Sequence, residues 1–170
     1  MNKQLKIIGF GIVVAGGFLC LATTPTQALS GEQRTAISQN CVSIQASLQR
    51  LQKADSRTRV FLGTSYEHIL TNYMSPLNVR LTKNNRIDST LFDIQTQFAS
   101  QRRKFTDTFT SYMKSLDDLI ATDCTQQPDG FYNKLENTRK QRGELHQLAQ
   151  DLHDLTNKNI DAVKKLRDSL

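Results

Sequence analysis

The stretch LFDIQTQFASQRRKFTDTFTSYMKSLDDL, residues 91–119, decides the fold of this chain. Its inward positions recur every three or four residues, at Leu91, Ile94, Phe98, Arg102, Phe105, Phe109, Tyr112, Leu116 and Leu119. Such steps place these side chains on one face of an α-helix. Only Arg102 interrupts the stripe, and Asp88 or Ser89 is available to cap the first turn. The stretch therefore predicts a long amphipathic helix with one face in the core.

The same spacing is found upstream, at Ile37, Cys41, Ile44, Leu48, Leu51, Leu62, Tyr66, Ile69, Tyr73 and Leu77. The polar run KADSRTR, residues 53–59, interrupts this second stripe. Ser30 and Gln33 have the spacing of a capping box, so the upstream helix is expected to begin at Gly31. Pro76 lacks a backbone donor and restricts the residue before it, so the helix is expected either to stop or to kink there.

A third stripe lies downstream, at Phe131, Leu135, Thr138, Arg142, Leu145, Leu148, Leu152, Leu155, Asn159, Val163 and Leu166. Arg142 and Asn159 are its polar exceptions. Pro128 and Asp129 suit the first turn of a helix, because proline needs no backbone partner there and an acidic residue complements the helix dipole.

Short polar segments separate the three stripes, TKNNRID at residues 82–88 and TDCTQQPDG at residues 122–130. Connections this short force consecutive helices to lie antiparallel. We therefore predict an all-α fold, an elongated, coiled-coil-like, antiparallel up-down-up three-helix bundle. Its helices should have roughly 45, 32 and 38 residues, which corresponds to lengths of about 50 to 65 Å at a rise of 1.5 Å per residue. Because the first helix is longer than the second, its end near Pro76 is expected to remain uncovered, unless the helix breaks near Pro76 or a partner chain packs there.

The N-terminus has the three parts of a secretory signal peptide. Lys3 and Lys6 form a basic start, residues 7–22 are apolar, and small side chains lead to a cleavage site between Ala28 and Leu29. The apolar run is shorter than the roughly 20 residues that cross a bilayer. An uncleaved N-terminal anchor remains the alternative. Either interpretation places the rest of the chain outside the cytoplasm.

With residues 1–28 assigned to the signal, residues 29–170 are expected to form a single helical-bundle domain. Removing Lys3 and Lys6 from the 22 Lys and Arg leaves 20, against 16 Asp and Glu. Much of this charge is arranged in pairs four residues apart, such as Glu136 with Lys140, which is typical of a solvated helix face. The remaining basic excess leaves open a preference for acidic partners.

Two cysteines, Cys41 and Cys124, lie outside the predicted signal peptide. In an antiparallel pair of helices, Cys41 should face roughly residues 127–131 if the intervening loop is centred near residue 85. The two cysteines then lie at the same end of the bundle, in an oxidising compartment. We predict a disulfide between them. The alternative is two separate buried thiols.

No arrangement of residues indicates catalysis, because the chain lacks a CxxC pair, a GxSxG turn and a phosphate-binding loop. We therefore predict that the protein is not an enzyme and needs no cofactor. His146 and His153 share one helix face, with His68 as a third candidate metal ligand. Two helical turns separate the first two by about 10 Å, too far for a single ion without further ligands. A metal-binding helical bundle is only an alternative.

Three stretches, LQKADSRTRVFLG (51–63), YMSPLNVRL (73–81) and LIATDCTQQPDGFYNKL (119–135), resemble small exported helical proteins of candidate-phylum bacteria of the Saccharibacteria type. The resemblance implies export and helicity, and it assigns no active residue. The chain is also similar in size, charge and expected architecture to exported helical chaperones of the Skp kind. It lacks the LTxxQ repeat of the related Spy and CpxP pattern, since LTNYM, LTKNN and LTNKN keep only its first two letters.

The sequence thus predicts a non-enzymatic, extracytoplasmic helical protein that serves as an interaction or scaffold protein of the cell envelope or cell surface. A holdase chaperone of the Skp or Spy kind is the first alternative, and the metal-binding bundle is the second. Expected partners are proteins or envelope polymers, with homo-oligomers possible and nucleic acid disfavoured by the compartment. Membrane contact is expected only through the N-terminal segment, if that segment stays uncleaved.

Overall fold

The computed structural model describes residues 29–169, and all regular structure in that range is helical. The elements are α1 (Gly31–Gln39), α2 (Cys41–His68), the π-helix η1 (Ile69–Met74), α3 (Ser75–Lys83), α4 (Ser89–Ile120) and α5 (Pro128–Asp168). The all-α class and the helical bundle are thereby confirmed. The predicted signal peptide and its cleavage after Ala28 lie outside the described residues. Across the described part of the chain, no helix has the combined length and apolarity needed to cross a membrane.

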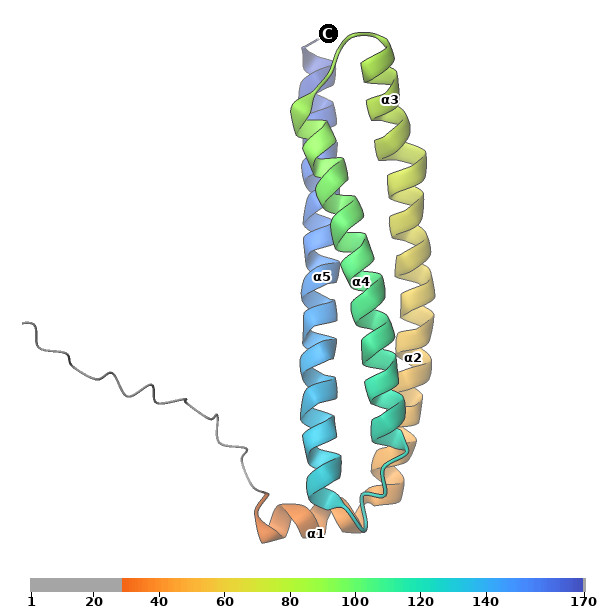
Figure 1. Ribbon diagram of the computed structural model, residues 1–170, viewed down its shortest axis with the longest axis vertical. Helices are drawn as coiled ribbons and strands as arrows, with labels where there is room; N and C mark the ends of the chain where they lie inside the picture. The colour runs from red at the N-terminus through yellow and green to blue at the C-terminus, as the bar shows by residue number, and fades with distance from the viewer. Residues whose placement is uncertain (1–28, 170) are drawn as a thin grey trace, which may run out of the picture.

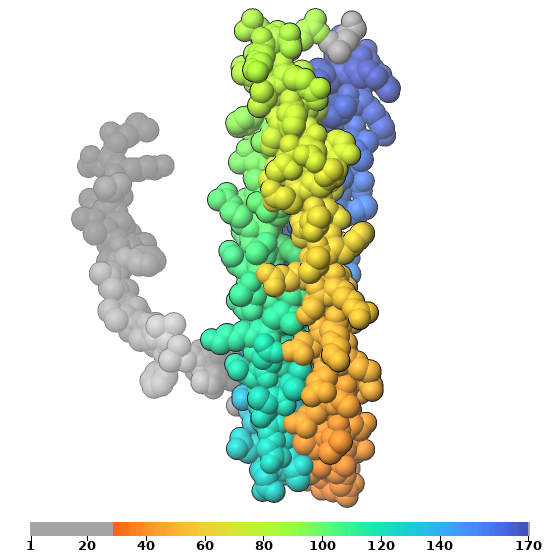
Figure 2. Space-filling model, turned by 90° about the vertical axis from the view of Figure 1, so that its right-hand side faces the viewer, coloured from red at the N-terminus to blue at the C-terminus, as the bar shows by residue number. Residues whose placement is uncertain are grey.

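The helices form a long, narrow rod (Figures 1 and 2). In Figure 1, α4 runs between α5 on one side and the continuous column of α2, η1 and α3 on the other. The α3–α4 connection lies at one end of the rod, and the α4–α5 connection lies at the other end. The helix α1 crosses the rod at the end that holds the α4–α5 connection.

The stripe on α4 forms the centre of the core. All eight of its apolar side chains are buried: Leu91, Ile94, Phe98, Phe105, Phe109, Tyr112, Leu116 and Leu119. The predicted caps are also present, since Asp88 accepts a hydrogen bond from the Leu91 N–H, and Ser30 and Gln33 form a reciprocal capping box. The apolar stripe from which α4 was predicted is therefore the face of α4 that packs against the neighbouring helices.

The upstream helix is interrupted at Asn40, which the sequence did not predict. The backbone of Asn40 leaves helical angles, with φ −102° and ψ 11°, so α1 ends before it and α2 begins at Cys41. The side-chain amide of Asn40 donates to the carbonyl of Ala36, the same carbonyl that its own backbone N–H reaches. Arg34 pairs with Asp129 at 2.9 Å and ties α1 to the start of α5. The apolar steps from Ile37 to Cys41 hid this break, because both side chains still pack against the core.

Pro76 does not end the helix. The backbone widens into η1 just before the proline, and the Ser75 N–H donates to the carbonyl of Leu70, a π-helical bond across five residues. The helix then continues as α3 to Lys83. The wider turn accommodates the missing donor of Pro76 without a break.

The expectation of an uncovered end near Pro76 is wrong, because α4 covers this region. Met74 is 1% exposed, and Asn78 is buried. The Asn78 side-chain amide donates to the Leu91 carbonyl at 3.2 Å and to the Gln95 side-chain oxygen at 2.6 Å. A buried amide that needs these partners fixes the register between α3 and α4.

A disulfide joins Cys41 to Cys124, as the sequence predicted, with their Cα atoms 5.5 Å apart. It connects the first residue of α2 to the turn between α4 and α5, and both cysteines are buried. The bond closes a loop across a sequence separation of 83 residues. A covalent link over such a loop removes many conformations from the unfolded chain.

We expect the double variant Cys41→Ser/Cys124→Ser to lose about 2–4 kcal/mol of unfolding free energy, because its unfolded chain is no longer crosslinked. Urea unfolding followed by circular dichroism measures this loss, and the reduced wild-type protein is the matched control. Reduced wild type and variant should unfold alike. Free thiols at both positions in protein isolated without reductant would contradict the expectation.

Candidate functional site: an open groove between α2–α3 and α5

The most prominent surface feature is the seam between the α2–η1–α3 column and α5. Helix α4 packs along both of these partners, whereas α2 and α5 have at most scattered close backbone contacts with each other. The seam contains several hollows, the first of which lies near α1. Leu48 and Leu51 of α2 and Phe131 and Leu135 of α5 line this hollow, which has a volume of about 680 Å³.

Three further hollows, of about 230, 720 and 490 Å³, follow along the seam. Adjacent hollows share lining residues. Leu62 and Ala149 line both the first and the second of these three hollows, and Ile69 and Thr156 line both the second and the third. They therefore form one continuous depression, which we call the α2–α5 groove. Its walls include Leu62, Tyr66, Ile69, Tyr73, Leu77 and Arg80 from the α2–α3 side. The α5 side contributes His146, Ala149, His153, Ile160, Val163 and Lys164.

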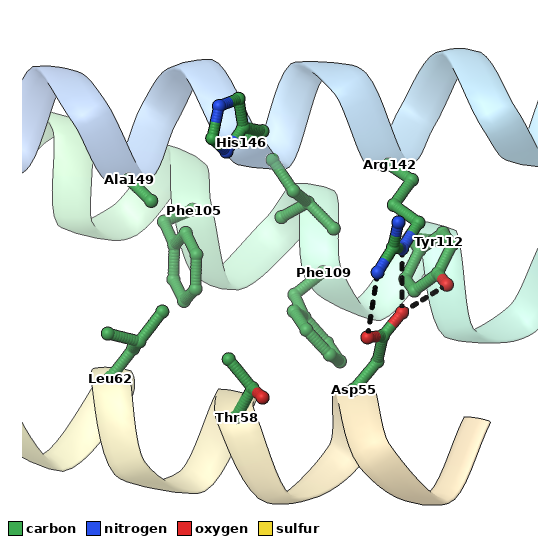
Figure 3. A pocket seen from close by; sticks show the side chains of 10 residues that line it. Asp55, Thr58, Leu62, Phe105, Phe109, Tyr112, Arg142, His146 and Ala149 are labelled. Carbon is green, nitrogen blue, oxygen red and sulfur yellow. Dashed lines mark hydrogen bonds and ion pairs between the residues drawn. The ribbon is translucent and has the colours of Figure 1, made fainter. Parts of the chain in front are cut away.

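A polar cluster closes one end of this groove (Figure 3). The Asp55 carboxylate accepts a hydrogen bond from the Tyr112 hydroxyl at 2.6 Å, and bonds from Arg142 Nε at 3.0 Å and Nη2 at 3.3 Å. These residues come from α2, α4 and α5, so one carboxylate connects the three long helices. Among the described residues, no other ion pair joins α2 to α5.

The surroundings of Asp55 fix the protonation states of its two partners. Burial raises the pKa of Tyr112 well above its usual value, and the hydrogen bond to Asp55 and its negative charge raise it further. The hydrogen bond to Asp55 also raises the pKa of Arg142. The phenol therefore stays neutral and donates, and the guanidinium stays charged. With its lone pairs bonded to these donors, Asp55 serves to hold the helices together.

The structure explains the polar exceptions in the predicted stripes. Arg142 reaches Asp55, which belongs to the polar interruption KADSRTR of the upstream stripe. Arg102 on α4 pairs with Glu67 on α2. Asn159 lies in the wall of the groove near Lys164. The interruptions thus mark the sites where polar side chains bridge the helices or line the groove.

The candidate metal ligands do not converge. His146 and His153 both line the α5 wall of the groove. His68 instead bonds to the Asn72 side chain at 2.6 Å and packs against the Tyr73 ring, with ring centres 5.3 Å apart. Within residues 29–169, no three His, Cys, Asp or Glu side chains lie close enough together to hold a metal ion.

The groove and the role of Asp55 were not recognised from the sequence. The steps of three and four show which side chains face inward, but they do not show how closely two inward faces approach. The sequence did contain a sign of this contact. Arg142 is a polar residue in the apolar stripe of one helix, and Asp55 lies in the polar run that interrupts the stripe of another. Because both stripes face the same core, an ion pair between these two residues could have been predicted.

No family model, curated protein or solved structure matches this chain. The functional interpretation therefore depends on the geometry of the described residues.

We expect Asp55→Ala to cost about 1–3 kcal/mol of unfolding free energy, because it leaves the buried Tyr112 hydroxyl and the Arg142 guanidinium without their acceptor. Asp154→Ala, which removes a carboxylate from the wall of the same groove, is the matched control and should change stability by no more than about 0.5 kcal/mol. Chemical denaturation of both variants measures the difference. Equal losses would show that Asp55 has no special role.

Proposed function

We propose that this protein is a non-enzymatic, extracytoplasmic interaction protein that binds a partner segment in the α2–α5 groove. The observation that carries the proposal is the groove itself, which is continuous over three hollows, with a mainly apolar wall on the α2–α3 side and a mixed polar and apolar wall on α5. Grooves of this kind between helices accept amphipathic segments of other proteins. The protein would act in the cell envelope or at the cell surface, on a protein or an envelope polymer.

Export and topology belong to the same proposal. The N-terminal sequence supports a cleaved signal peptide, and a disulfide suits an oxidising compartment. The two helix connections at opposite ends of the rod support an antiparallel up-down-up bundle (Figure 1). In this proposal α2, η1 and α3 act together as the first long helix, and α1 closes one end.

A holdase chaperone is the second candidate function. Such a protein needs an exposed apolar surface beside basic residues, and the groove combines Ile69, Leu77 and Ile160 with Arg80 and Lys164. A holdase would accept many unfolded chains, whereas a dedicated interaction protein would accept one segment. The metal-binding alternative has less support, because His68 is engaged elsewhere.

A photoreactive amino acid at Ile160, inside the groove, should crosslink to one defined segment of a partner in the native cell. The same amino acid at Val60 is the matched control, because Val60 is also exposed but does not line any of the groove hollows. Mass spectrometry of the adducts identifies the segment. Many unrelated segments at Ile160 would favour the holdase, and the absence of adducts would contradict both functions.

A further inference from the structure

Within residues 29–169, the packing of the helices leaves the position of a fourth helix vacant. In a four-helix bundle, each helix packs against two neighbours and not against the helix diagonally opposite. Helix α4 packs against both the α2–η1–α3 column and α5, while α2 and α5 stay apart. These elements therefore occupy three corners of such a bundle. In Figure 3, α4 lies behind the groove, and the walls come from α2 and α5.

The length of the groove fits a helix. From Leu62 to Arg80 the α2–α3 wall extends about 27 Å at 1.5 Å per residue, or about five helical turns. Leu62, Ile69 and Leu77 line the groove along the α2–α3 wall. Apolar side chains of α5 line it at both ends of its wall, with Leu145 and Ala149 at one end and Ile160 and Val163 at the other. An amphipathic helix laid in the groove would bury its apolar stripe against both walls.

The charge of the groove indicates which kind of helix. Arg80 and Lys164 line the section between α3 and α5, and no carboxylate lines that section. Lys164 contacts Asp161 at 3.3 Å, but both side chains are more than half exposed, so this pair contributes little and can be exchanged. Acidic side chains flanking an apolar stripe would complement the two cations.

We propose that the α2–α5 groove binds an acidic amphipathic helix of another protein, which completes a four-helix bundle and pairs with Arg80 and Lys164. This inference rests on the proposed function and names the class of its partner. A second copy of the chain suits the groove less well, because without Lys3 and Lys6 of the proposed signal peptide the sequence still has 20 Lys and Arg against 16 Asp and Glu. Two copies would therefore bring an excess of like charges together.

The test uses the purified protein and three labelled synthetic peptides of about 18 residues, which match the length of the groove wall. One peptide is an amphipathic helix with leucines on one face and glutamates beside it. The second replaces the glutamates by lysines, and the third scrambles the first. Fluorescence anisotropy should show that the glutamate peptide binds at least about tenfold tighter than either of the others. Equal affinities would overturn the proposal.

The double variant Arg80→Glu/Lys164→Glu should bind the glutamate peptide about tenfold more weakly, because attraction becomes repulsion. Lys158→Glu/Lys165→Glu is the matched control, since these lysines lie with Asp88 and Ile94 at a different seam of α5. The control should keep the wild-type affinity, and circular dichroism checks that both variants are folded. Equal weakening in both variants would overturn the proposal.

Two further outcomes distinguish the possible occupants. Binding of oleate without binding of the glutamate peptide would assign the groove to a lipid chain and overturn the proposal. Adducts at Ile160 in the cell without binding of the glutamate peptide would overturn the acidic-helix inference and leave the proposed function standing. Failure of both experiments would remove both proposals.

Discussion

The carboxylate of Asp55 is the interaction on which the arrangement of the three long helices depends. It accepts hydrogen bonds from Tyr112 on α4 and Arg142 on α5. Apolar stripes alone would allow the helices to slide by a turn, because leucine packs against leucine in several registers. The Asp55 side chain is only 15% exposed, so a register without its two donors would leave a largely desolvated charge unpaired. Asn78 does the same for α3 and α4 near the other end.

This polar anchoring also explains how the seam between α2 and α5 can stay open. Apolar contact is supplied mainly by α4, whose whole stripe is buried between the other two. Across the seam, the long Arg142 side chain reaches Asp55 without bringing the two backbones into close packing. Beyond the Asp55 cluster, at the end of the rod that holds the α4–α5 connection, the disulfide holds α2 to the α4–α5 turn, and the Arg34–Asp129 pair holds α1 to the start of α5. The two walls of the groove are therefore joined at and beyond its closed end.

Much of the fold could be predicted from the sequence, because helical periodicity, caps and turns are local properties. The stripe of α4 and the Ser30 capping box were found in this way, and the two cysteines were paired by antiparallel register. The break at Asn40 was missed because the inward-facing steps continue through it. The π-helix before Pro76 was missed because the sequence shows that the proline lacks a donor but not how the backbone adjusts to it. The groove depends on distances between helices, which periodicity does not contain.

Distances between spin labels on the three helices test the open seam most directly. Arg57 of α2, Thr110 of α4 and Lys140 of α5 are exposed positions near the level of the Asp55 cluster, and labels on cysteines introduced there leave the buried disulfide intact. If α4 stands between two partners that do not pack together, the distance from position 57 to position 140 exceeds the other two. Three similar distances would show a closed triangular bundle and would contradict the groove.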